Sequence, residues 1–251
     1  MLAYARSLSH AHSLVFALHW SWVERQCAQA EPAALLSLAD ELLTLADEHS
    51  YAMWRAYGLA IRGWCLAALG RPGQGVPLLD AGLAEIRASA KLHVPHVLTL
   101  FADAYRMAGQ PVAALPYVAE AEQFAEATQA KWLQAETLRL RGDLLLITED
   151  RAAAEAAYHN AIELARKQGA KFWELCAATS LARMWRDQGK RTDARELLAP
   201  VYSWFTEGFG TPVLQDAKAL LDELSADQSP GMSDGVASAP ASSRNAVYDS
   251  A

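Results

Sequence analysis

The chain has 251 residues, 52% of them hydrophobic, which is enough apolar material for a continuous core and excludes disorder of the whole chain. Alanine supplies about a fifth of the residues, against only 14 glycines and 10 prolines, so the composition favours helices and argues against an all-β or collagen-like protein. The formal charge of −7, without any long Lys/Arg run, argues against nucleic-acid binding.

Helix start and stop signals predict eleven helices along the chain. In chain order they cover residues 8–29, 32–48, 51–69, 72–90, 95–108, 111–128, 131–148, 151–168, 171–188, 191–206 and 212–224. Paired in sequence, these helices make five hairpins and one closing helix. Three prolines, Pro77, Pro116 and Pro200, lie inside predicted helices, and we expect them to kink these helices or to shift their starts.

Four of the predicted helices are repeats of one another. The segments that align without gaps are Leu59–Gly70, Leu98–Gly109, Leu138–Glu149 and Ala178–Gly189, whose ends lie 39 or 40 residues apart. One column holds only small residues, Gly63, Ala102, Gly142 and Ala182, and a bulky apolar residue follows three positions later. Two antiparallel helices can cross closely where one of them carries Gly or Ala, and a large side chain then fills the adjoining gap. The pattern therefore predicts stacked helical hairpins.

The ends of the repeats carry the residues that such hairpins need. Gly70, Gly109 and Gly189 stand where a left-handed residue ends a helix, and Pro72 and Pro111 follow in the first turn of the next. In the third repeat, Asp150 can serve as the N-cap instead. From residue 225 to 251 the chain is rich in Ser, Ala, Gly and Pro, so we expect a disordered tail after a repeat domain spanning residues 1–224.

A second column of small residues follows farther on, at Gly75, Ala114, Ala154 and Ala194. The columns of small, large and small residues resemble tetratricopeptide (TPR) repeats. The period of about 40 exceeds the 34 residues of that unit, and helices of five turns would absorb the difference. The resemblance implies an all-α, TPR-like helical-hairpin solenoid of about five hairpins plus a capping helix.

A more specific resemblance covers residues 1–224. They look like the C-terminal repeat region of bacterial proteins that join an adenylate/guanylate cyclase or DNA-binding domain to an AAA/STAND-type ATPase. The stretches that carry it are IRGWCLAALGR (61–71), ADAYRMAGQP (102–111), AETLRLRGDLLL (135–146) and WELCAATSLARMWRDQGKRTDARELLAPVYSWFTEGF (173–209). The resemblance implies a sensor or scaffold part of a bacterial signalling protein.

Catalytic motifs of that family do not occur in this chain. A P-loop needs G-x-x-x-x-G-K-[ST], and the one glycine cluster, Gly70–Gly75, lacks the Lys-Ser/Thr and is expected to be a repeat turn. Cyclase chemistry needs two metal-binding Asp residues on a β-rich domain, and no strand-like alternation is present. A G-x-S-x-G hydrolase elbow is also missing. We therefore predict a non-catalytic chain.

Metal and cofactor sites are not expected either. His10 and His12 lie on different faces of a helix, and no second cysteine near Cys27 completes a zinc set. The three cysteines are scattered, which fits a reducing cytoplasm, and the chain shows neither a long signal-peptide core nor a stretch apolar enough to span a membrane. We expect core packing, rather than a ligand cage, for the tryptophans: Trp20, Trp22, Trp54, Trp64, Trp132, Trp173, Trp185 and Trp204.

The resemblance to TPR arrays also implies where a partner would bind. In such arrays the concave groove is lined by positions of the first helix of each hairpin, close to the small residue. Counted from the small column, these positions hold Trp64, Thr99, Asp103, Arg106, Arg139, Asp143, Arg183 and Arg186, together with Leu146 and Thr179. The four arginines could present a basic stripe to an acidic segment. Alternatively, they could pair within the chain with Asp103, Asp143 and Asp187.

Two classes of function remain open. The chain can be a binding or regulatory module whose groove takes a protein or acidic peptide partner, a small effector, or a cyclase/ATPase module. Alternatively, it is a fragment or split-gene product that assists cyclase or ATPase activity supplied by another chain, or it carries an unrecognised hydrolase site. A coding frame immediately upstream for a P-loop or cyclase domain would favour the second class.

Overall fold

The computed structural model describes residues 1–8, 10–27, 29–89 and 93–226, and within them the protein is all-helical. Helices make up 83% of these residues, and no strand occurs among them. From the N-terminus the helices are α1 (Leu2–Ser7), α2 (Ala11–Cys27), α3 (Pro32–Glu48), α4 (Ala52–Ala68), α5 (Pro72–Ser89), α6 (Val94–Met107), α7 (Pro111–Thr128), α8 (Gln134–Ile147), α9 (Arg151–Gln168), α10 (Lys171–Asp187), α11 (Arg191–Tyr202) and α12 (Pro212–Ala226).

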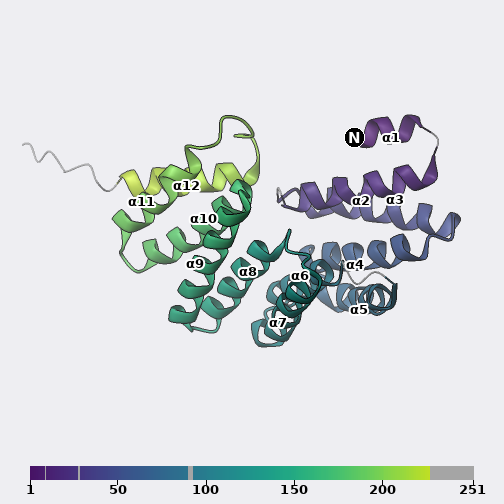
Figure 1. Ribbon diagram of the computed structural model, residues 1–251, viewed down its shortest axis with the longest axis horizontal. Coiled ribbons are helices and arrows are strands. Elements are labelled where there is room, and N and C mark those ends of the chain that lie inside the picture. The colour runs from purple at the N-terminus through teal and green to yellow at the C-terminus, as the bar shows by residue number, and fades with distance from the viewer. Residues whose placement is uncertain (9, 28, 90–92, 227–251) are drawn as a thin grey trace, which may run out of the picture.

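The helices form five consecutive hairpins, α2/α3 to α10/α11, closed by α12, which confirms the predicted solenoid. Each even-numbered helix from α2 to α10 also packs on the next even-numbered helix, so these helices form one continuous layer. The hairpins follow an arc in Figure 1, and the turn between α2 and α3 points back toward α10 and α12. The even-numbered helices therefore line the inside of the arc, and the two ends of the array approach each other across it.

Close crossings occur at the small column, as the sequence predicts. A Cβ on Gly63 would stand 2.5 Å from the carbonyl oxygen of Gly75, and one on Gly142 would stand 2.4 Å from the ring of Tyr158. Ala102 and Ala182 are fully buried. Neither glycine position has room for a larger residue, because the partner helix already fills the space.

The helix ends also follow the predicted signals. Gly70, Gly109 and Gly189 adopt φ angles between 71° and 79°, the left-handed region that a residue without Cβ enters at little cost. The side chain of Asp150 accepts a 3.1 Å hydrogen bond from the Ala153 amide and so caps α9.

Some predicted boundaries are wrong. The helix predicted over 8–29 covers only Ala11–Cys27, and a separate, unpredicted helix, Leu2–Ser7, precedes it. Nδ1 of His10 accepts the amide hydrogen of Ser13 at 3.2 Å and so caps the helix that begins at Ala11. The helix predicted over 191–206 ends at Tyr202. Pro77 and Pro116 do not shift the starts of their helices.

These two prolines are each the sixth residue of their helix, so each removes only one backbone hydrogen bond close to the helix N-terminus. At the other end of the chain, α12 continues to Ala226, two residues beyond the predicted end. The rest of the predicted disordered tail, 227–251, lies outside the described residues.

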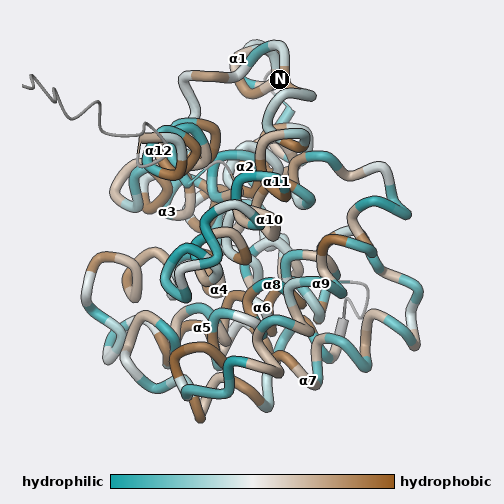
Figure 2. Tube along the Cα trace, turned by 90° about the vertical axis from the view of Figure 1, so that its left-hand side faces the viewer, coloured by the Kyte–Doolittle hydropathy of each residue, from teal (hydrophilic) through white to brown (hydrophobic). Residues whose placement is uncertain are grey.

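The core follows the contacts between neighbouring helices, and hydrophobic and hydrophilic segments alternate along them in Figure 2. Among the tryptophans, Trp22, Trp54 and Trp64 are buried, as predicted. The prediction is wrong for Trp132, which is 38% exposed in the turn before α8, and for Trp204, which is 59% exposed in the turn after α11. Both lie in turns, and the spacing of residues along a helix does not predict where a side chain in a turn points.

Candidate functional site

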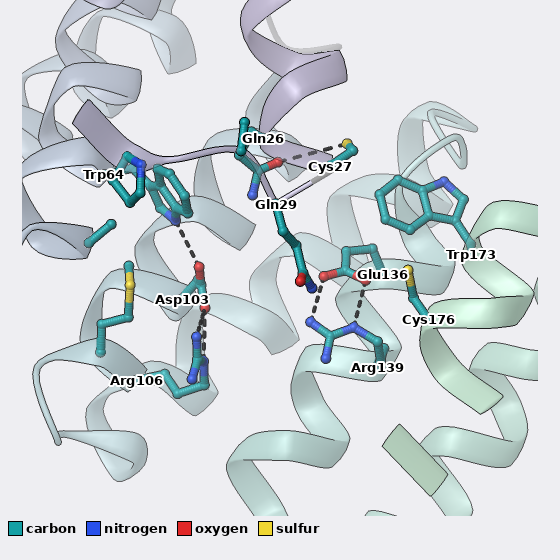
Figure 3. A pocket seen from close by; sticks show the side chains of 14 residues that line it. Gln26, Cys27, Gln29, Trp64, Asp103, Arg106, Glu136, Arg139, Trp173 and Cys176 are labelled. Atoms are coloured by element: carbon teal, nitrogen blue, oxygen red, sulfur yellow. Dashed lines mark hydrogen bonds and ion pairs between the residues drawn. The ribbon is translucent and has the colours of Figure 1, made fainter. Parts of the chain in front are cut away.

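The main cavity of the inner surface, about 320 Å³ in volume, lies where the α2–α3 turn meets the inner helices (Figure 3). One wall comes from the end of α2 and the turn, and the others from α4, α6, α8 and the start of α10. Its lining residues are Gln26, Cys27, Gln29, Ala30, Pro32, Trp64, Ala68, Asp103, Arg106, Met107, Glu136, Arg139, Trp173 and Cys176. Because five consecutive hairpins contribute, the cavity exists only when the whole array is folded.

A first polar group links two consecutive repeats in the cavity wall. The indole Nε1 of Trp64 donates a 2.8 Å hydrogen bond to Oδ2 of Asp103, and Oδ1 of the same carboxylate accepts from Arg106 at 2.8 Å. Asp103 is only 17% exposed, so its charge depends on these two donors for stabilisation.

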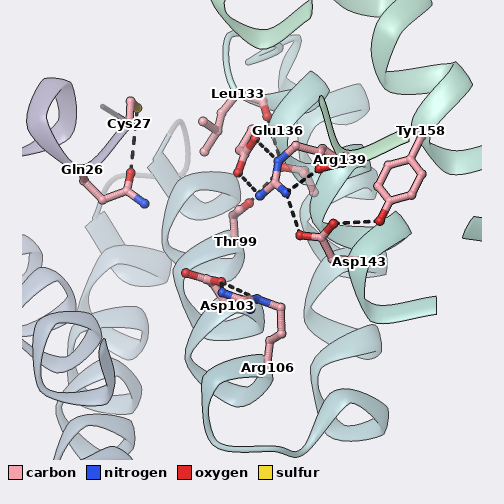
Figure 4. A network of polar contacts seen from close by, with 12 residues as sticks. Gln26, Cys27, Thr99, Asp103, Arg106, Leu133, Glu136, Arg139, Asp143 and Tyr158 are labelled. Atoms are coloured by element: carbon pink, nitrogen blue, oxygen red, sulfur yellow. Dashed lines mark hydrogen bonds and ion pairs between the residues drawn. The ribbon is translucent and has the colours of Figure 1, made fainter. Parts of the chain in front are cut away.

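The second polar group is centred on Arg139 (Figure 4). Its guanidinium donates through Nε and one terminal nitrogen to the two carboxylate oxygens of Glu136, and through the other nitrogen to Asp143 at 2.6 Å. The Tyr158 hydroxyl donates to the remaining oxygen of Asp143 at 2.8 Å. Burial lowers the pKa of Arg139, but the two carboxylates outweigh it and hold that pKa well above its ordinary value.

Two thiols, Cys27 at the end of α2 and Cys176 on α10, line the same cavity. Burial, followed by the nearby charge of Glu136, raises the pKa of Cys27 to about 12, and the same causes raise that of Cys176. The thiols are therefore protonated at neutral pH and lack the thiolate that nucleophilic catalysis or metal binding requires. Among the described residues, no group of three His, Cys, Asp or Glu side chains is arranged to hold a metal ion.

The residues predicted to form the groove divide into three groups. Trp64, Asp103, Arg106 and Arg139 line the main cavity. Thr179 and Arg183 line a smaller cavity of about 60 Å³ beside it, which Arg139 also borders.

The remaining predicted residues lie outside the two cavities. Thr99 is buried and shares a 2.9 Å hydrogen bond with Thr137. Asp143 accepts a hydrogen bond from Arg139 on the side away from the cavity lining. Arg186 points to the end of the array, where it pairs with Asp187 and Glu223.

All four predicted arginines have ion-pair partners in the chain. Arg106 pairs with Asp103, Arg139 with Glu136 and Asp143, Arg183 with both oxygens of Asp216, and Arg186 with Asp187 and Glu223. The three intramolecular pairs that the sequence left open are therefore present, and the arginines do not form a row of free guanidinium groups.

Several cavity residues were not predicted from the sequence. Gln26, Cys27 and Gln29 come from the first hairpin, and Trp173 and Cys176 precede the small column of the fifth. Counting positions within one repeat cannot find them, because the curvature of the whole array brings the first hairpin opposite the fifth.

A second cluster on the inner helices contains histidines and aromatic rings. His19 of α2 packs its ring 4.5 Å from that of Tyr57, and His93 and His96 contact the same tyrosine. Burial, followed by the charge of neighbouring histidines, lowers the pKa of both His19 and His96 to about 3. Nδ1 of each ring is buried without a hydrogen-bond partner among the described residues. The imidazoles of His19 and His96 are therefore neutral at neutral pH.

In sequence, no protein-family model matches the chain, and no curated protein matches it either. Solved structures do match in fold. BtubC (BKLC) from P. vanneervenii superimposes with a TM-score of 0.61 at 12% identity, over 86% of this chain and 97% of the other. A Podosopora anserina putative kinesin light chain with nearly identical TPR-like repeats gives a TM-score of 0.52 at 15% identity, over 86% and 98% of the two chains. A variant of that protein gives 0.53 at 16% identity, over 75% and 93%.

These similarities identify the fold as a TPR-like solenoid. At identities of 12–16% they concern the fold alone. In the part of the chain that the structure describes, no helix is long and apolar enough to cross a membrane.

Proposed function

We propose that this protein is a non-catalytic interaction module that holds a segment of a protein partner in the cavity inside its arc. The observation that carries the proposal is the cavity itself, because residues from five hairpins converge on it and no single hairpin could form it. Ligand sites are typically concave, with a few polar groups that orient the ligand among apolar walls. The lining has this mixture, with Trp64 and Met107 beside Asp103 and Glu136.

The proposal extends to the setting in which the module works. The resemblance of residues 173–209 to repeat regions of cyclase/ATPase proteins supports a regulatory role in a bacterial, cytoplasmic signalling protein. In that role, the partner would be a cyclase or AAA/STAND-type ATPase module, on the same or another chain. The alternative is that the chain assists the activity of such a module as a split-gene product. A change in the ATPase or cyclase rate of a neighbouring module on addition of this chain would support the alternative.

Site-specific cross-linking tests the binding function. A photoreactive phenylalanine analogue placed at Met107 lies at the cavity, and the same analogue at Val112, 71% exposed at the start of α7, serves as the matched control. We expect one partner to be cross-linked from position 107 and not from position 112, in cells of the native host. Equal cross-linking from both positions, or none from 107, would contradict a partner site in the cavity.

A further inference from the structure

We propose that the cavity recognises a cationic side chain, lysine or arginine, on the partner protein. This inference rests on the proposed binding function and specifies its chemistry. It differs from the expectation of an acidic partner, which assumed that the arginines of the groove were free. Because those arginines are paired, their charge is offset within the chain, and the carboxylates beside them keep acceptor positions for a ligand.

The charges at the cavity favour a cation. The charged residues of the lining are Asp103 and Glu136 against Arg106 and Arg139, and Asp143, which stands outside the lining and pairs with Arg139, brings the network to a net charge of −1. The chain as a whole carries −7. A site of low exposure and negative net charge attracts a cation and repels a carboxylate.

The hydrogen-bonding capacity agrees with the charge. All three nitrogens of Arg139 already donate, to Glu136, Asp143 and Ser180. Each carboxylate oxygen of Glu136 accepts one bond from Arg139, and an ionised carboxylate oxygen can accept a second. A ligand ammonium or guanidinium can therefore bind without breaking an existing pair, whereas an anion at the remaining N–H groups of Arg106 or Arg139 would stand beside the carboxylates that already pair with them.

The walls suit a cation on an alkyl chain. The indoles of Trp64 and Trp173 border the cavity, and Figure 3 shows Trp173 above Cys176 on the side of α10. Indole is the preferred aromatic partner of ammonium and guanidinium groups, and its apolar face also covers methylene groups. The neutral thiol of Cys176 adds an uncharged surface beside it.

Size and entrance indicate a side chain on a peptide. A cavity of about 320 Å³ is at the lower end of the roughly 300–1,000 Å³ of ligand pockets, so it admits one long side chain rather than a helix. Gln29 stands on the turn at one edge, and its side chain points toward Glu136 in Figure 3. The backbone amide of Gln29 donates to Gln26, but its side-chain amide makes no hydrogen bond to another described residue and is available to the main chain of a partner.

The probes for the test are N-acetyl-arginine amide and N-acetyl-lysine amide, added to the full chain labelled with ¹⁵N at the tryptophan indoles. Uncharged N-acetyl-citrulline amide and anionic N-acetyl-aspartate monoamide are the matched negative probes. We expect saturable shifts of the Trp173 indole signal, assigned through a Trp173→Phe variant, with the two cations only. Comparing the affinities of the arginine and lysine probes then shows whether the cavity prefers a guanidinium or an ammonium group. Equal shifts with citrulline amide, or larger shifts with the aspartate probe, would overturn the proposal.

The variant Glu136→Gln keeps the shape of the side chain and removes its charge. We expect it to weaken binding of the cationic probes about tenfold, the effect of losing one charged hydrogen bond. Glu163→Gln is the control, because Glu163 is 68% exposed on α9, away from the cavity lining. Thermal unfolding of both variants checks their folding. If Glu136→Gln is unfolded, the Trp173→Leu variant replaces it, with binding followed at the Trp64 indole, which also lines the cavity. Unchanged affinity in a folded variant of either kind would contradict the proposal.

The two proposals fail in different ways. A partner that cross-links from position 107 while the cationic probes leave Trp173 unshifted would keep the interaction module and remove the cationic specificity. Probe binding at Trp173 without any partner cross-linked from the cavity would instead indicate a small-molecule site and remove the protein-binding function.

Discussion

The indole of Trp64 and the carboxylate of Asp103 occupy equivalent positions of consecutive repeats and share a 2.8 Å hydrogen bond. Trp64 directly follows Gly63, the small residue of its repeat, and Asp103 directly follows Ala102 in the next repeat. Trp64 and Asp103 are therefore 39 residues apart in the sequence. Residues one repeat period apart in the sequence are therefore in direct contact between neighbouring inner helices. This contact forms part of the wall of the cavity.

We expect replacement of Trp64 by Phe to destabilise the protein. The change removes the indole N–H and leaves one oxygen of Asp103, itself only 17% exposed, without its donor. The expected loss is about 1–3 kcal/mol of unfolding free energy, measured by urea denaturation. Trp204→Phe, at a 59% exposed site, is the control and should change stability little. Equal effects of the two changes would mean that the hydrogen bond does not contribute.

Gly142→Ala tests the close helix crossing. The new Cβ would stand 2.4 Å from the ring of Tyr158, so the ring must move and its hydrogen bond to Asp143 is disturbed. We expect a loss of roughly 1–3 kcal/mol in urea denaturation. Gly73→Ala lies in α5 with no atom within 4 Å, so there the same change should be neutral or stabilising. An unchanged midpoint for Gly142→Ala would show that the crossing is looser than described.

Arg139 and Arg183 should differ strongly when each is changed to Met. Arg139 is 19% exposed, and its loss leaves Glu136 and Asp143 close together without a counter-charge. We expect a cost of about 3–5 kcal/mol for Arg139→Met, as for other broken buried pairs. Arg183 and Asp216 are 41% and 48% exposed, so their pair should be worth about 0–1 kcal/mol. Urea denaturation measures both costs, and similar losses of unfolding free energy for the two variants would contradict a special structural role of the Arg139 pairs.

Acid should destabilise the cluster around His19 and His96. Both have a folded-state pKa of about 3 against an ordinary value of 6.5, so below pH 6.5 the unfolded chain binds more protons. The stabilisation is complete above about pH 6.5 and is lost as the pH falls toward 3, by roughly 1.4 kcal/mol per histidine and pH unit. Urea denaturation at pH 7.5, 6.5, 5.5 and 4.5 measures the slope. His96→Phe should flatten it and the exposed His159→Phe should not, so equal slopes would contradict the assignment.

The sequence by itself determined the hairpins and their stacking. The small column and the glycine helix ends are local requirements, since a close crossing needs a residue without bulk and a left-handed helix end favours glycine. For that reason Gly63, Gly142, Gly70 and Asp150 have the roles that their residue types predict. Positions counted from the small column also identified Trp64 and Arg139 as neighbours of the cavity.

Only the tertiary structure decided which residues meet across the arc. Gln29 and Cys176 border the same cavity although almost 150 residues separate them, because small rotations between successive hairpins add up to the curvature of the array. The state of the arginines was likewise undecided in the sequence. Glu136 and Asp143 lie on the same helix face as Arg139, close enough to pair with it. Whether the three side chains pair with one another or with solvent and a partner depends on burial, which strengthens the attraction between them.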